Sequence, residues 1–139
     1  MTNFGSTSGL TGVIGAGVTF TNSGSPTSAN KKVANLPGTT AVSDLYIADN
    51  AALQLSTWSV EGWFKFNQLP VAGKSPAIIG KGTGGTRNFS VHLNSDGSMW
   101  FGIRHSTNGA TEQGATTDPN IVDSGKWYHL VFKIGRAHV

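Results

Sequence analysis

The feature that most limits the possible folds is a series of short segments in which apolar and polar residues alternate. Glycine, proline or asparagine separates these segments. The clearest run is Thr57 to Phe66, whose period of two residues is that of a half-buried β-strand. From Asp44 onward such runs recur about every 8 to 15 residues, a spacing typical of an antiparallel sandwich or barrel. The two faces of the clearest run hold Trp58, Val60, Gly62, Phe64 and Phe66, and Ser59, Glu61, Trp63 and Lys65.

Composition excludes several other classes of protein. The chain has 139 residues, 19 of them glycine and none cysteine, so we expect one domain without disulfides, thiolate metal sites or long helices. The net charge of +3 reflects the small number of acidic residues. The basic residues are dispersed, and only Lys31 and Lys32 are adjacent. We therefore expect no nucleic-acid partner. No apolar run reaches about 18 residues, which argues against membrane insertion, and no signal peptide is visible at the N-terminus.

The middle of the chain predicts a β-hairpin. Residues Asn88 to Leu93 and Ser98 to Arg104 are joined through Asn94-Ser95-Asp96-Gly97, and Asp-Gly between two alternating runs is a strong turn signal. The alternation predicts an apolar face and a polar face. The apolar face holds Phe89, Val91, Leu93, Met99, Phe101 and Ile103, and the polar face holds Ser90, His92, Trp100, Gly102 and Arg104.

Further segments complete the expected all-β fold. Residues Pro76 to Lys81 read as a strand, Ser106 to Thr117 as a loop, and Asp123-Ser124-Gly125 as a turn. The run Lys126 to Phe132 is apolar or aromatic at nearly every position, which predicts a strand buried on both faces. His129, within that run, is then expected to be a hydrogen-bonded core histidine.

Residues 1–43 have a different texture from the rest. They are rich in glycine, serine, threonine and asparagine, with apolar islands at Leu10 to Ile14 and Val18 to Phe20. We expect one or two short strands there, or a linker. The main sandwich is expected over residues 44–133.

Five segments in order resemble the successive strands of a laminin G-like, concanavalin A-like jelly roll. The resemblance covers about Leu45 to Phe132, and it implies an antiparallel jelly-roll β-sandwich that serves as a glycan- or protein-binding module, in some members with bound calcium. It also implies a secreted, cell-surface or phage structural protein. The segments are Leu45 to Asn50, Trp58 to Lys65, Ile78 to Gly82, Gly97 to Ile103 and Gly125 to Phe132.

The C-terminal residues depart from that family, in which further strands follow the one like Trp127 to Phe132. Residues Ile134 to Val139 read Ile-Gly-Arg-Ala-His-Val, which resembles one translated frame of a widely used sequencing adapter. We therefore expect a truncated environmental gene fragment, a sandwich incomplete at its C-terminus, and a non-native tail over residues 134–139. A genuine short tail is the alternative.

Candidate chemistry favours binding over catalysis. Glu61 and Glu112 are the only glutamates, and Glu61 has Ser59 and Trp63 as same-face neighbours, so the closely spaced carboxylate pair of a retaining glycosidase is missing. The histidines lack zinc-ligand spacing. Calcium is possible because Asp49, Asp96, Asp118 and Asp123 lie at turns, although turn capping by the side chains is the simpler interpretation.

Aromatic residues on the polar strand faces are the candidate ligand contacts. Trp63 lies beside Glu61 and Lys65, and Trp100 beside His92 and Arg104, which would give a sugar an apolar plane and hydrogen-bonding groups. Packing beneath a loop or another strand is the alternative for both tryptophans. The sequence thus predicts Trp63, His92, Trp100 and Arg104 as ligand-binding residues.

The predicted function is a non-catalytic module that recognises a carbohydrate or a surface protein. The alternative is a structural or adhesive domain of a phage tail or bacterial surface protein that mediates protein contacts. The domain is expected to be part of a larger protein and to lie outside the cell, at the cell surface or on a virion.

Overall fold

A computed structural model describes residues 10–27, 32–38, 44–53, 57–82, 88–104 and 112–134. The described part contains ten β-strands and one 3-10 turn of helix, which agrees with the expected all-β class. The chain divides into two compact units, Met1–Trp58 with Lys133–Val139, and Ser59–Phe132.

The first unit contains two short antiparallel strand pairs. Strand β1 (Gly12–Ile14) pairs with β4 (Leu45–Ile47), and β2 (Thr19–Thr21) pairs with β3 (Val33–Asn35). Each predicted apolar island thus overlaps a strand, whereas β3 had no clear sequence signal. Helix η1 (Ala51–Leu53) follows Asn50, whose side-chain oxygen accepts a hydrogen bond from the Ala52 N–H at 2.9 Å.

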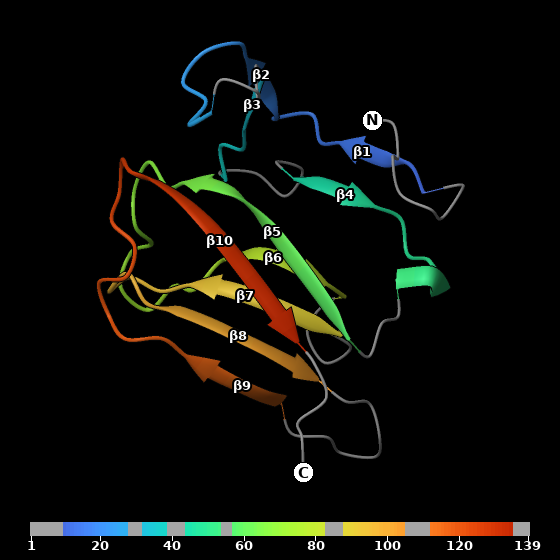
Figure 1. Cartoon of the computed structure of the whole chain (residues 1–139), viewed down its shortest axis with the longest axis vertical. Coiled ribbons are helices and arrows are strands. Elements are labelled where there is room, and N and C mark those ends of the chain that lie inside the picture. Colours follow the sequence, from blue (N-terminus) through green and yellow to red (C-terminus); the bar gives the residue numbers. More distant parts are fainter. Residues whose placement is uncertain are drawn as a thin grey trace. The chain divides into compact units, whose positions relative to one another are not determined.

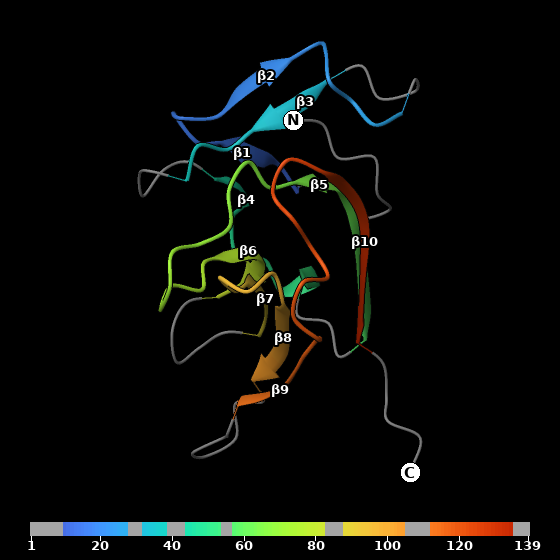
Figure 2. The ribbon, with the colours of Figure 1, turned by 90° about the vertical axis from the view of Figure 1, so that its left-hand side faces the viewer.

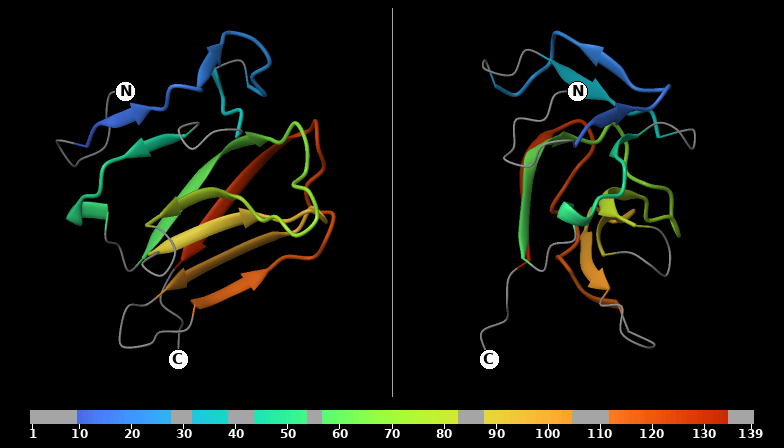
Figure 3. Two further views of the ribbon diagram at one scale, coloured as in Figure 1. Left: turned by 180° about the vertical axis from the view of Figure 1, so that it is seen from behind. Right: turned by 90° about the vertical axis from the view of Figure 1, so that its right-hand side faces the viewer.

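The second unit has two layers of antiparallel strands. A four-stranded sheet has the order β6 (Ala77–Lys81), β7 (Phe89–Leu93), β8 (Met99–Arg104), β9 (Glu112–Thr116). Strand β5 (Trp58–Lys65) pairs with β10 (Trp127–Ile134), and the two run in opposite directions (Figure 1). Figures 2 and 3 show this pair as a separate layer beside the four-stranded sheet. The predicted sandwich architecture is confirmed.

The β7–β8 hairpin has the predicted position and the predicted faces. Val91 lies opposite Phe101, and His92 lies opposite Trp100. Val91, Leu93 and Met99 are almost completely buried, because this face of the sheet forms the interior of the unit. The face that carries His92 and Trp100 is therefore the outer face of the four-stranded sheet.

Strand β5 alternates as predicted, but β10 does not have two buried faces. In β5, residues Trp58 to Lys65 alternate between half-buried and exposed. In β10, Phe132 is buried, whereas Val131 retains 57% of its accessible surface and the His129 side chain 43%. The expectation of a buried strand with a core histidine was wrong, because the outward side of the β5–β10 layer faces solvent.

Part of the predicted loop Ser106 to Thr117 is also a strand. Residues Glu112–Thr116 form β9 and pair in register with β8. This strand is polar and exposed, so it lacks the apolar alternation by which the others were predicted. At the opposite edge of the sheet, a register shift between Ala77 and Ile79 interrupts β6.

A loop between β9 and β10 fastens the hairpin turn to the end of β5. The Asn120 N–H donates to the Asp96 carbonyl at 2.8 Å and the Val122 N–H to the Gly97 carbonyl at 3.1 Å, while the Gly125 N–H donates to the Phe66 carbonyl at 2.7 Å. Val122 is buried. The loop therefore connects the two layers through main-chain hydrogen bonds.

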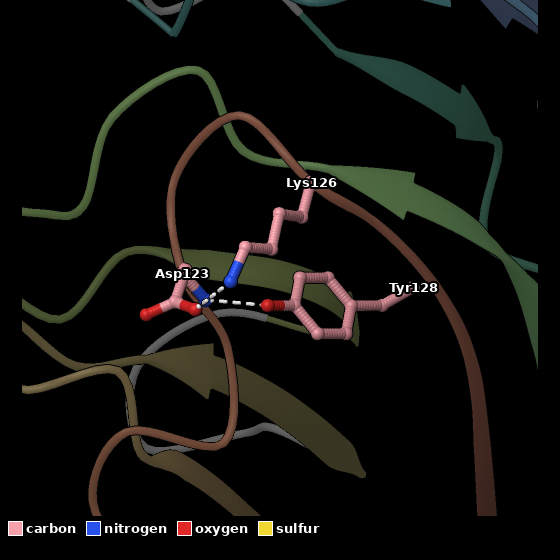
Figure 4. Close-up of polar contacts among 3 residues, drawn as sticks. All are labelled: Asp123, Lys126 and Tyr128. Atoms are coloured by element: carbon pink, nitrogen blue, oxygen red, sulfur yellow. Dashed lines mark hydrogen bonds and ion pairs between the residues drawn. The ribbon is translucent and has the colours of Figure 1, made fainter.

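Side chains fix the last turn of this loop. The Asp123 N–H donates to the Tyr128 hydroxyl at 2.8 Å, and the Lys126 ammonium donates to Asp123 Oδ2 at 2.7 Å (Figure 4). The hydrogen bond to Asp123 raises the pKa of Lys126, and the carboxylate's negative charge adds to the effect. The predicted turn at residues 123–125 is confirmed, with Gly125 at φ 79°.

Asp96 organises the hairpin turn. Its Oδ1 accepts hydrogen bonds from the Ser98 N–H at 2.9 Å and from the Ser98 hydroxyl at 2.6 Å. These bonds favour the ionised carboxylate and lower the pKa of Asp96. The Asn94 N–H also donates to the Ser98 carbonyl at 2.9 Å, which closes the turn.

Gly97 is expected to tolerate no side chain. Its φ is 75°, and an added Cβ would overlap the Val122 carbonyl oxygen. Gly73 has nearly the same φ of 76° but no neighbouring atom within 4 Å of an added Cβ. We expect Gly73→Ala to lower the free energy of unfolding by about 1 kcal/mol, and Gly97→Ala by about 3 kcal/mol. Urea denaturation of both variants measures the difference. Equal losses would contradict a close approach at Gly97.

Acid should remove the contribution of Asp96 to stability. Because folding lowers the pKa of this group below its ordinary value of 3.8, its contribution is present above that pH and disappears as the pH falls through the folded-state value. We expect Asp96→Asn to destabilise the protein at neutral pH, with a difference from the wild type that shrinks below about pH 3.8. Urea midpoints across the acid range measure this, with Asp44→Asn as the control. A difference that does not depend on pH would contradict the assignment.

Candidate functional site

Trp100 lies across two glycines on the outer face of the four-stranded sheet. A Cβ at Gly102 would lie 2.5 Å from Cζ2 and Cη2 of the indole, and a Cβ at Gly114 would lie 2.7 Å from Cε2 and Cζ2. Gly102 and Gly114 face each other on β8 and β9. The six-membered ring of Trp100 thus occupies space that any side chain at either position would fill, and it rests against the sheet.

His92 stands beside this indole. The two ring centroids are 5.3 Å apart and the planes meet at 69°, an edge-on arrangement. The pair is directly opposed in the β7–β8 register. Because the Trp100 ring is held from below by the sheet and from the side by His92, its position is well defined.

Hydrogen bonds hold the imidazole of His92. Its Nδ1 lies 2.6 Å from the Ser75 carbonyl oxygen, which only accepts, so Nδ1 carries the hydrogen and donates. Its Nε2 lies 2.7 Å from the Ser90 hydroxyl, and in the neutral imidazole Nε2 accepts from that hydroxyl. Both ring nitrogens are therefore occupied by the protein, and His92 orients Trp100 instead of presenting a nitrogen to a ligand.

Trp63 belongs to a different surface. It lies on the exposed side of β5 and retains 42% of its accessible surface. Its ring centroid is 5.1 Å from that of His129 on β10, and the planes are tilted by 48°. His129 Nε2 is also 4.0 Å from Glu61 Oε2, and the Glu61 side chain is 71% exposed. Trp63, His129 and Glu61 thus form one cluster on the outer face of the β5–β10 layer.

The predicted ligand-binding residues do not converge on one place. The structure brings His92 and Trp100 together, but Trp63 lies on the other layer, whose outer face points the opposite way. Arg104 ends β8 and pairs with Glu112 in register, and its side chain lies outside the described residues.

Several contributing residues were absent from the predicted set. Gly102 shares the polar face of Trp100 in the sequence pattern, but only the β8–β9 pairing shows that Gly114 lies beside it. Ser75 belongs to the segment before β6, and no local motif connects it with His92. His129 was expected in the core, and instead contacts Trp63.

Acidic side chains at the turns serve local structure. Asp96 accepts hydrogen bonds from Ser98, and Asp123 accepts one from Lys126. Within the described ranges no three histidine, aspartate or glutamate side chains gather in a way that would hold a metal ion. The turn-capping interpretation is thus supported for Asp96, whose carboxylate accepts from a backbone N–H, whereas the Asp123 carboxylate forms an ion pair with Lys126.

The described residues contain no helix with the length and apolar character needed to cross a membrane.

Comparison with known proteins places the chain in a family. No curated protein and no solved structure matches the chain. A laminin G-type family model, described as the concanavalin A-like lectin/glucanases superfamily, matches residues 38–139. Such domains are often binding modules, generally non-catalytic and typically extracellular. The chain, with its antiparallel two-layer unit and this match over most of its length, belongs to the concanavalin A-like lectin/glucanase superfamily.

Proposed function

We propose that this domain is a non-catalytic module that binds carbohydrate through the Trp100 surface. The single observation that supports this most is the position of the indole, which rests on Gly102 and Gly114 beside the edge of His92. Trp100 is half-buried, so part of the ring remains accessible to a ligand. The C–H face of a pyranose ring can stack on such a surface.

Preorganisation favours this surface as a binding site. A ligand that stacks on Trp100 would not need to immobilise the indole, because the glycines and His92 already restrict it. Thr116 lies opposite Trp100 in the β8–β9 register and on the same face, so we assign its hydroxyl to the sugar as a hydrogen-bonding group. We also assign Arg104 to the ligand, from its place in β8 on the same face. Trp63 is left out because it lies on the other layer.

The proposal includes the setting of the domain. We infer an extracellular, cell-surface or virion location, within a larger protein, and no catalytic activity. Support comes from the family's general character.

A structural or adhesive role that relies on protein contacts is the second candidate. The observation in its favour is a set of exposed apolar side chains on the paired strands β1 and β4, which is more than a sugar-binding surface needs. The side chains are Val13, Ile14, Leu45, Tyr46 and Ile47.

Removal of the Trp100 ring should weaken carbohydrate binding. We expect the wild-type chain to be retarded in native gels that contain at least one of soluble xylan, galactomannan, laminarin or hydroxyethylcellulose. Trp100→Ala should weaken that retardation at least tenfold, equivalent to about 1.4 kcal/mol. Trp63→Ala, at micromolar protein concentration, is the matched control and should bind normally. Binding of none of these polymers, or equal losses in both variants, would favour protein contacts instead. Release of reducing sugars would contradict the absence of catalysis.

Displacement of the indole should have a similar effect without its removal. In Gly114→Ala the new methyl group would lie 2.7 Å from the Trp100 ring and from the Phe101 carbonyl oxygen, so the ring and the local β8–β9 pairing must both shift. We therefore expect altered near-ultraviolet circular dichroism and at least fivefold weaker retardation. The control is Gln113→Ala, one residue away on the opposite face of β9. Unchanged binding in Gly114→Ala would show that the ring position seen in the structure does not matter for the ligand.

A further inference from the structure

A chain of side-chain hydrogen bonds leads from the hairpin turn to His92. Asn94 Nδ2 lies 2.9 Å from the Ser98 hydroxyl, and Asn94 Oδ1 lies 2.7 Å from the Ser75 hydroxyl. The Ser75 carbonyl oxygen is in turn the partner of His92 Nδ1 at 2.6 Å. At the other end, the Ser98 hydroxyl lies 2.6 Å from Asp96 Oδ1. We refer to Asp96, Ser98, Asn94 and Ser75 as the turn network.

The Asp96 carboxylate fixes the direction of the hydrogen bonds in the turn network. The N–H and the hydroxyl of Ser98 both bond to it and lower its pKa, so the group is ionised at neutral pH and only accepts. The single hydroxyl hydrogen of Ser98 is thus used, and its oxygen accepts from the amide nitrogen of Asn94. The amide oxygen of Asn94 then faces Ser75, whose hydroxyl donates to it.

An extra residue in β6 places Ser75 where it can join the turn network. The register shift that precedes Ile79 gives β6 one residue more than β7 over the same length. The shifted alignment continues beyond the strand, because the Leu93 N–H donates to the Pro76 carbonyl at 3.2 Å. The next pair along is Ser75 and Asn94. Without the extra residue Pro76 would face Asn94, and proline has no hydroxyl to donate.

We propose that Asn94 is a positioning residue for the Trp100 surface, an inference that rests on the proposed carbohydrate site. Its amide holds the Ser75 segment against β7, so that the Ser75 carbonyl keeps the hydrogen of His92 on Nδ1 and the ring edge-on to Trp100. Nε2 of His92 then remains an acceptor for the hydroxyl of Ser90, which is a buried residue. Asn94 itself does not contact the sugar and acts through His92.

The turn network adds to a frame of main-chain hydrogen bonds. The Asn94 N–H donates to the Ser98 carbonyl at 2.9 Å, and this bond does not need the Asn94 side chain. Ser75 is exposed, so water competes for its hydroxyl. We therefore expect loss of the bond between the Ser75 and Asn94 side chains to release the His92 ring without unfolding the hairpin.

Nitrogen-15 NMR of the His92 ring in the whole chain, at about pH 8.5, tests the positioning role. In a neutral imidazole the protonated and unprotonated nitrogens are distinct, so their shifts report the tautomer, and His92→Gln identifies the signals. We expect the wild type to carry the hydrogen on Nδ1 alone, and Asn94→Ala and Ser75→Ala each to populate both tautomers. The double variant should resemble either single one, because both substitutions break the same link to His92.

Conservative and control variants accompany these substitutions. Ser75→Thr keeps the hydroxyl and should retain the wild-type spectrum. Ser95→Ala changes an exposed residue of the same turn and should retain it as well. On a polymer that retards the wild type in native gels, Asn94→Ala and Ser75→Ala should each weaken retardation at least threefold, whereas Ser75→Thr and Ser95→Ala should bind normally.

The outcomes separate this inference from the function on which it rests. A wild-type hydrogen on Nε2 of His92, or a spectrum unchanged in Asn94→Ala and Ser75→Ala, would overturn the positioning role. Additive changes in the double variant, loss of the wild-type spectrum in Ser75→Thr, or undiminished retardation in both alanine variants would overturn it too. If no polymer retards the wild type, the carbohydrate proposal fails, while the His92 tautomer still decides the role of Asn94. Ser75→Ala alters an exposed side chain, so it carries the test alone if Asn94→Ala fails to fold.

Discussion

The close approach of the Gly97 turn to the Val122 segment is the constraint on which the rest of the larger unit depends. Main-chain hydrogen bonds from Asn120 and Val122 reach the hairpin turn, and one from Gly125 reaches the end of β5. Only a residue without a side chain, at positive φ, leaves room for this contact. The two layers are therefore fastened at one end by backbone atoms, and the buried residues Val91, Leu93 and Met99 fill the interior beyond that point.

The same hairpin register positions the candidate site. Once Val91 lies opposite Phe101, His92 must lie opposite Trp100, and the pairing of β8 with β9 brings Gly102 next to Gly114. A shift of one residue would reverse the faces and move the indole into the interior. The surface proposed for carbohydrate thus follows from register, and the glycines permit the ring to lie against the sheet.

Sequence reasoning predicted the features that rest on local pattern. The alternation of β5 and the Asn94 to Gly97 turn were evident because period and turn chemistry are properties of neighbouring residues. Strand β9 was missed because it is polar and exposed, so its pairing partner alone defines it. The burial of β10 was wrong because an apolar run does not reveal whether a second layer covers its outward side.

In the candidate site, too, some features follow from neighbouring residues and others only from the way the strands pair. The adjacency of His92 and Trp100 follows from the hairpin and was predictable, whereas the separation of Trp63 from them depends on which layer each strand joins. Ser75 and Gly114 come from segments with no motif of their own, and their contributions are visible only in three dimensions.

The edges of the four-stranded sheet have a consequence for behaviour at high local concentration. A register shift interrupts β6 at one edge, and at the other β9 carries no large apolar side chain. Irregular or polar edge strands are poor templates for the addition of a further strand from another molecule. Copies of this unit crowded side by side would accordingly resist edge-to-edge joining through the four-stranded sheet, the kind of contact that leads to fibrous aggregates.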